Sequence, residues 1–173
     1  MNDQKSGARA ANIILAVAAV TSVAALGTAI GQDVLIDRYI EGAFSAFGIF
    51  MIANPVAKLS ILFAFLVAAL NSLMAILALV LGRKAQPKGA FTPLEIITLC
   101  GAFVLIGLGL LSCAYSEANI LMAAQAVGSV SLEITAPYRV EQLFTLGMAL
   151  WPAAFGLLMV AASMRLRLKA KAH

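Results

Sequence analysis

The feature that most constrains this sequence is a set of four long apolar runs, none of which carries a charged residue near its middle. A helix needs about 20 apolar residues to cross the hydrocarbon core of a bilayer. Backbone groups in lipid must be satisfied within a helix or a closed barrel, and these runs lack the short alternation of barrel strands. We therefore predict an all-α membrane protein, a four-transmembrane-helix bundle with spans at about residues 12–31, 57–82, 93–114 and 138–164.

The composition supports one integral membrane domain over the whole chain. Of 173 residues, 62% are hydrophobic and only 12% are charged, which leaves too little polar surface to cover a water-soluble domain. Lys5 and Arg9 precede the first apolar run as they would in a signal peptide, but we expect an uncleaved first span.

The basic residues predict the orientation of the chain. Twelve are present, and nine lie before the first span, between the second and third, or after the fourth: Lys5, Arg9, Arg83, Lys84, Lys88, Arg165, Arg167, Lys169 and Lys171. The positive-inside rule then places both termini in the cytoplasm, and we expect a bacterial cytoplasmic (inner) membrane. Because these bases are scattered at span ends, they give no support for nucleic-acid binding.

The first outer segment, residues 33–51, has the periodicity of an amphipathic helix. Its acids Asp33, Asp37 and Glu41 lie on one face, opposite an apolar stripe rich in phenylalanine. Such a segment is too polar to cross the bilayer, so we predict that it lies in the outer interface. The alternative is that the three acids and the apolar stripe form a binding surface.

The second outer segment gives a weaker pattern. We predict a short helix through Ala124, followed by an extended stretch from Ser129 to Thr135 in which apolar and polar residues alternate. Aligning the two halves of the chain places Pro55 on Pro137, each just before a span. The chain is therefore a candidate for two helical hairpins related by a pseudo-repeat, although two hairpins that converged on one proline-started pattern explain the match equally well.

The start of the third span carries a capping signal. Thr92 is a favourable N-cap, Pro93 suits the first helical position, and Glu95 stands where a capping box requires it. We interpret Glu95 as a capping residue without a further role.

The sequence contains no recognisable set of catalytic or metal-binding residues. The single histidine is His173 at the C-terminus, and no serine in a span has a base within helical reach. Cys100 and Cys113 share one span about 20 Å apart, which is too far for a disulfide. We predict no catalytic residue, no metal site and no cofactor, and therefore a protein that is not an enzyme.

Small residues recur at helical spacing in three of the spans. Because lipid offers no hydrophobic drive between helices, such faces allow the close packing that holds membrane helices together. They predict a tight bundle, an oligomer, or both. The faces are Ala18, Ser22, Ala25 and Ala29; Ala64, Ala68, Asn71, Ala75 and Ala78; and Ala149, Ala153, Gly156 and Ser163.

A few polar or helix-breaking residues are candidate sites. Asn71, near a span centre, predicts a contact between helices or with a conducting path. Pro152 predicts a kink and a free carbonyl one turn earlier. At the outer rim we predict an ion pair between Lys58 and Glu141, with Arg139 reaching lipid phosphates or a loop acid.

The second half of the chain resembles a known family. The run 105–109, LIGLG, precedes Tyr115, and the last span begins at the run 136–143, APYRVEQL. Both resemble the proton-channel subunits of flagellar stators and Ton/Tol energy transducers, which implies third and fourth spans joined outside and a proton path. The pore threonines of that family correspond to Leu108 and Leu146, and its large cytoplasmic domain is missing. The resemblance covers less than half of the chain.

Our leading prediction is a non-enzymatic membrane protein that acts by lateral helix association. It would serve as an accessory or assembly subunit of a larger complex or as a homo-oligomer, with the bilayer and other membrane proteins as partners. The first alternative is a subunit of an ion- or solute-conducting oligomer, with Asn71, Pro152 and the outer acids along the path. The second is a lipid- or quinone-binding protein that uses the phenylalanine-rich outer segment.

Overall fold

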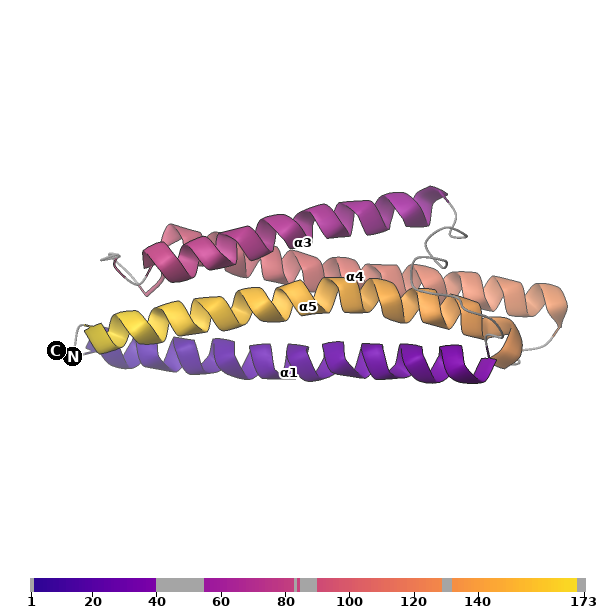
Figure 1. Ribbon diagram of the computed structural model, residues 1–173, viewed down its shortest axis with the longest axis horizontal. Helices are drawn as coiled ribbons and strands as arrows, with labels where there is room; N and C mark the ends of the chain where they lie inside the picture. The colour runs from indigo at the N-terminus through magenta and orange to yellow at the C-terminus, as the bar shows by residue number, and fades with distance from the viewer. Residues whose placement is uncertain (1, 40–54, 83, 85–89, 129–131, 171–173) are drawn as a thin grey trace.

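The structure, a computed structural model, describes residues 2–39, 55–82, 84, 90–128 and 132–170. This part of the chain is all-helical and forms four long helices side by side (Figure 1). They are α1 (Asn2–Tyr39), α3 (Pro55–Gly82), α4 (Pro93–Val127) and α5 (Leu132–Ala170). Each helix is long and apolar enough to cross a membrane, so the predicted class of fold is confirmed.

The helices extend beyond several of the predicted spans. α1 continues past residue 31 to Tyr39, with Asp33 and Asp37 exposed on its last turns. No glycine or proline interrupts residues 32–39, and acidic residues are compatible with a helix once it has left the bilayer. The predicted helical structure of this segment is therefore present through Tyr39, as a continuation of α1 and not apart from it, and its place at the outer interface stays a prediction. The rest of that segment, including Glu41, lies outside the described residues.

The second outer segment also differs from its prediction. α4 runs without interruption to Val127 and ends at Gly128, whose φ of 72° lies in the left-handed region that glycine favours. α5 then begins at Leu132, so the extended stretch predicted to reach Thr135 is wrong from residue 132 onward. The helix satisfies its own backbone groups, which an extended stretch does only with a neighbouring strand. Pro137 consequently lies inside α5 and does not start it.

The predicted capping box at the start of α4 is confirmed. The backbone N–H of Glu95 donates to the Thr92 hydroxyl at 3.3 Å, and the Thr92 N–H donates to the Glu95 carboxylate at 2.7 Å. Pro93 occupies the first turn. This start is local in sequence, which is why the pattern alone predicted it.

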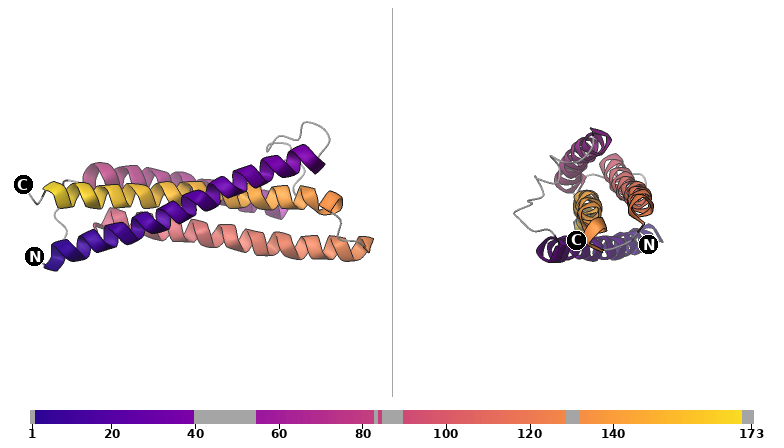
Figure 2. Two further views of the ribbon diagram at one scale, coloured as in Figure 1. Left: turned by 90° about the horizontal axis from the view of Figure 1, so that it is seen from below. Right: turned by 90° about the vertical axis from the view of Figure 1, so that its right-hand side faces the viewer.

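α5 is the central helix. Half of its most apolar window is buried inside the chain, compared with 22–28% for the other three helices. α1 packs against one side of α5 and crosses it obliquely, while α3 and α4 pack against the other side and against each other (Figure 2). Among the described helices, α1 therefore depends on α5 for its packing.

Small residues allow this close approach of helices. A Cβ at Gly147 of α5 would lie 2.9 Å from the Thr28 hydroxyl of α1, and one at Gly109 of α4 would lie 3.0 Å from the Ala149 Cβ of α5. Most of the small residues predicted to form packing faces are buried within the chain: Ala18, Ala25, Ala68, Asn71, Ala75, Ala78, Ala149, Ala153, Gly156 and Ser163. These faces therefore hold the helices of one chain together.

Candidate functional site

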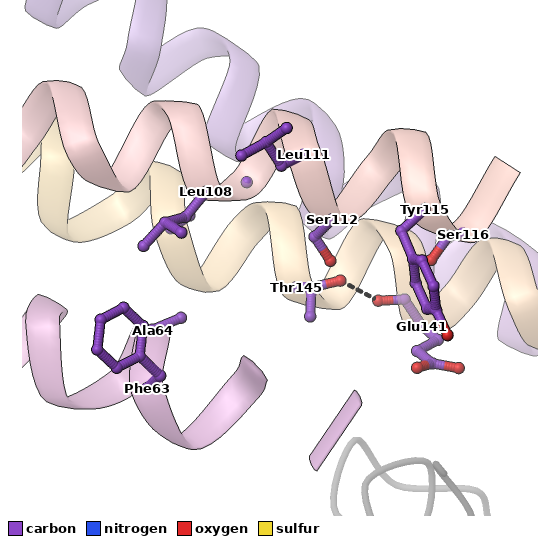
Figure 3. A pocket seen from close by; sticks show the side chains of 11 residues that line it. Phe63, Ala64, Leu108, Leu111, Ser112, Tyr115, Ser116, Glu141 and Thr145 are labelled. Atoms are coloured by element: carbon purple, nitrogen blue, oxygen red, sulfur yellow. Dashed lines mark hydrogen bonds between the residues drawn. The ribbon is translucent and has the colours of Figure 1, made fainter. Parts of the chain in front are cut away.

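A pocket of about 250 Å³ lies between α3, α4 and α5 (Figure 3). Its walls are mainly apolar, with Phe63 and Ala64 from α3 facing Leu108 and Leu111 from α4. It lies in the half of the bundle remote from the chain termini (Figure 1). All three helices are candidate membrane spans, and every residue that lines the pocket lies within them.

Five side chains with polar groups line this pocket: Ser112, Tyr115 and Ser116 from α4, and Glu141 and Thr145 from α5. The Thr145 hydroxyl donates to the Glu141 carbonyl oxygen at 2.7 Å, and Ser112 points toward Thr145 (Figure 3). The Glu141 carboxylate makes no hydrogen bond or ion pair with any described side chain. The pocket thus combines an apolar wall with one carboxylate that no described side chain pairs with.

Arg139 pairs with an acid on the neighbouring helix. Its two terminal nitrogens donate to the two carboxylate oxygens of Glu117 in α4, one of them at 3.0 Å. Gln142 extends this network, because it accepts from Arg139 at 3.1 Å and donates to the Cys113 carbonyl at 3.1 Å. Both charged side chains are more than a third exposed, so the pair contributes no more than about 1 kcal/mol in water.

The predicted pairing of Lys58 with Glu141 stays a prediction, since the side chain of Lys58 lies outside the described part of the structure. Two positions apart on one helix, Arg139 and Glu141 point in different directions. Arg139 meets Glu117, and Glu141 lines the pocket.

Asn71 is buried where three helices meet. Its side-chain N–H group donates to the Pro152 carbonyl of α5 at 3.3 Å. The amide lies in a slot between two glycines: a Cβ at Gly156 would lie 2.6 Å from the nitrogen, and one at Gly101 would overlap the oxygen. Asn71 is 3% exposed and does not line the pocket. Asn71 therefore forms a contact between helices. Neither Asn71 nor Pro152 lines the pocket.

A buried ion pair at the other end of the bundle was missed from the sequence. Arg167 donates to Glu95 at 3.0 Å and to the Ala90 carbonyl at 2.9 Å, and the Ser163 hydroxyl lies 2.8 Å from the same carboxylate. Glu95 is fully buried and Arg167 is 5% exposed. One signal was available, because Ser163 and Arg167 are four residues apart and share a helix face.

These arrangements are suited to binding and packing. No group of three or more histidine, cysteine, aspartate or glutamate side chains in the described part could hold a metal ion. No family model, no curated protein and no solved structure matches this chain.

Proposed function

We propose that this chain is a non-enzymatic membrane subunit that acts by lateral association, either with copies of itself or with other membrane proteins. The observation that supports this function is the pocket with Glu141. Polar groups within a bilayer are covered by protein or face a water-filled cavity. A partner helix placed against α3 and α4 would cover the carboxylate and its neighbouring hydroxyls.

The packing of the helices within one chain limits which surfaces remain exposed for association with a partner. Most residues of the small-residue faces are already buried between helices of the same chain, so they are not available to a partner. The rim of the pocket is different, since Phe63 is 55% exposed and Leu111 is 68% exposed. We assign the association surface to this rim.

Site-specific photocrosslinking tests this surface. Benzoylphenylalanine in place of Leu111 is expected to give a crosslinked adduct in native membranes, because the partner would lie against that side chain. Val23 is the matched control, since it is 71% exposed on α1, away from the pocket. An adduct at twice the 18.0 kDa mass of the chain would indicate self-association. Equal adducts at both positions, or none at position 111, would contradict the proposal.

The proposal includes an orientation with both termini in the cytoplasm of a bacterial inner membrane. Its support is the distribution of the basic residues in the sequence. In the structure the two ends of the chain lie at the same end of the bundle, as an even number of spans requires (Figure 1). The two-hairpin pseudo-repeat stays a prediction.

A second candidate function is ion conduction by an oligomer, and one observation favours it. Ser112, Ser116, Thr145 and Glu141 line one pocket inside the candidate membrane spans Pro93–Met122 and Tyr138–Ala170, and polar groups within spans mark ion pathways in membrane proteins. The resemblance to proton-channel subunits points in the same direction. Asn71 would not take part, because it is buried outside the pocket.

Flux measurements separate the two functions. If the chain conducts, the purified protein in liposomes should give an ion flux that Ser112→Ala lowers, because the lost hydroxyl lines the pocket. Ser72→Ala is the matched control: this hydroxyl bonds to the Ala68 carbonyl of its own helix at 2.8 Å and lies outside the pocket. An accessory subunit should give no flux in either form.

A further inference from the structure

A second hollow lies at the opposite end of the bundle, between the first turns of α1 and the last turns of α5. Its volume is about 350 Å³. Ala8 and Asn12 line it from α1, and Arg165, Leu166, Leu168 and Lys169 line it from α5. Both chain termini lie at this end of the bundle (Figure 1).

The rim of the hollow is basic. Arg165 and Lys169 are exposed and lie one turn apart on the same face of α5. One terminal nitrogen of Arg165 donates to the Asn12 side-chain oxygen at 2.9 Å, which ties the guanidinium to α1. In the described part of the chain, neither Arg165 nor Lys169 forms an ion pair. Within the side chains that the structure describes, no acid compensates the positive charge at the rim.

The acidic side chains at this end of the bundle are Asp3, in the first turn of α1, and Glu95, in the first turn of α4; the side chain of Asp3 lies outside the described part of the structure. Glu95 is fully buried and its carboxylate is already paired with Arg167. On α1, the exposed Lys5 and Arg9 add further positive charge to the same end of the molecule. Lys5 and Arg9 do not line the hollow, so they add to the positive potential at this end of the molecule, while Arg165 and Lys169 supply the charge at the rim itself.

The remaining walls of the hollow are apolar, since Ala8, Leu166 and Leu168 line it. The hollow lies at the ends of two candidate membrane spans, where apolar residues give way to basic ones. At this depth in a bilayer the phosphates of lipid headgroups lie beside the first methylene groups of the acyl chains. The hollow has the same arrangement, with basic side chains at its rim where a phosphate would lie and apolar side chains on its wall where an acyl chain would lie.

We propose that this hollow binds an anionic glycerophospholipid. Arg165 and Lys169 contact the headgroup phosphate, and an acyl chain lies against Leu166 along the seam between α1 and α5. Basic hollows between transmembrane helices at the cytoplasmic side are suited to anionic headgroups. A soluble phosphate ion would use the bases but would leave the apolar wall without an occupant.

Such a lipid would have a structural consequence that goes beyond the association proposed above. α1 packs against α5 through the most extensive contact between described helices, and it scarcely touches α3 or α4. A lipid that contacts both helices would add a second attachment for α1. The site lies at the far end of the bundle from the pocket with Glu141 and shares no lining residue with it. A test of lipid binding is therefore independent of the proposed association through the Glu141 pocket.

Native mass spectrometry of the full-length chain in detergent tests this site. The protein should retain phosphatidylglycerol in preference to phosphatidylcholine. Each basic residue near an anionic phosphate strengthens binding by about fivefold, so the double variant Arg165→Gln, Lys169→Gln should bind phosphatidylglycerol about 25-fold more weakly. Asn12→Ala, which removes only the anchor of Arg165, should weaken binding by a smaller factor.

The double variant Arg38→Gln, Lys84→Gln is the matched control. It removes the same net charge from two exposed positions that do not line the hollow, and it should retain the lipid as the unchanged chain does. Equal loss of lipid in both double variants would show binding by net charge alone and would overturn the site. Equal retention of the two lipids, or full displacement of phosphatidylglycerol by millimolar inorganic phosphate, would also overturn it.

Discussion

Replacement of Arg167 by methionine is expected to lower the free energy of unfolding by about 3 to 5 kcal/mol, because it leaves a buried carboxylate without its counter-charge. Glu95 is fully buried, and its ion pair with Arg167 is 3.0 Å long. The Arg167 side chain is itself only 7% exposed, so water cannot replace it. Equilibrium unfolding in mixed micelles by increasing sodium dodecyl sulfate, followed by circular dichroism, measures this loss.

Two further variants make this prediction specific. Arg165→Met removes the same charge two positions earlier from an exposed side chain, and should change the unfolding free energy by no more than about 0.5 kcal/mol. The double variant Glu95→Gln, Arg167→Met should recover much of the loss, since it buries no charge and glutamine keeps the capping box. If Arg167→Met and Arg165→Met had equal effects, the buried pair would not stabilise the bundle.

The ion pair belongs to a cluster that joins three helices. The Ser163 hydroxyl of α5 lies 3.0 Å from the Ala78 carbonyl of α3 as well as 2.8 Å from the Glu95 carboxylate of α4. A Cβ at Gly82 would lie 2.6 Å from the same hydroxyl, so the end of α3 packs closely here. Breaking the pair therefore loosens the contact among all three helices.

The two ends of the bundle are held differently. The pair of Arg167 with Glu95 is buried, whereas the pair of Arg139 with Glu117 is more than a third exposed on both sides. Removing one partner of an exposed ion pair lowers the free energy of unfolding less than removing one partner of a buried pair, which leaves a buried charge without its counter-charge. The exposed pair joins only α4 and α5, whereas the cluster around Glu95 joins α3, α4 and α5, so the side-chain network that links all three helices lies at the end remote from the Glu141 pocket.

The parts of the fold that could be predicted from the sequence depend on local signals. Four apolar runs predicted four helices, and the spacing of Thr92 and Glu95 predicted a capping box that the structure confirms. Helix length was not predictable in the same way. An apolar run shows how much of a helix can lie in the hydrocarbon core, but a helix can continue beyond that core into polar sequence. Asp33 and Asp37 therefore looked like the start of a new segment, although they continue α1.

Contacts between distant residues were beyond the sequence patterns. Arg167 and Glu95 are 72 positions apart, and Asn71 and Pro152 are 81 positions apart. Small residues predicted that helices would pack closely, but not which helices would form pairs. The central place of α5, which decides both contacts, is a property of the tertiary structure.

The second large effect on stability is expected at the slot between Gly101 and Gly156 that holds the Asn71 amide. Gly101→Ala is expected to lower the free energy of unfolding by about 1 to 3 kcal/mol, because the added methyl group would overlap the Asn71 side-chain oxygen in a packed interior. The amide cannot move aside easily, since Gly156 closes the slot at its other end. The same detergent titration measures this change.

Gly107→Ala on the same helix is the matched control, since a Cβ there would meet no atom within 4 Å. It should be neutral or stabilise α4 by about 0.5 to 1 kcal/mol, the usual gain when alanine replaces glycine in a helix. The double variant Gly101→Ala, Asn71→Ala should recover most of the stability, because it empties the slot at the loss of one interhelical hydrogen bond, about 0.6 kcal/mol in membrane proteins. If Asn71→Ala gave no rescue, the overlap would lie elsewhere. Crosslinking through position 111 should be unchanged in Asn71→Ala, since Asn71 does not line the pocket.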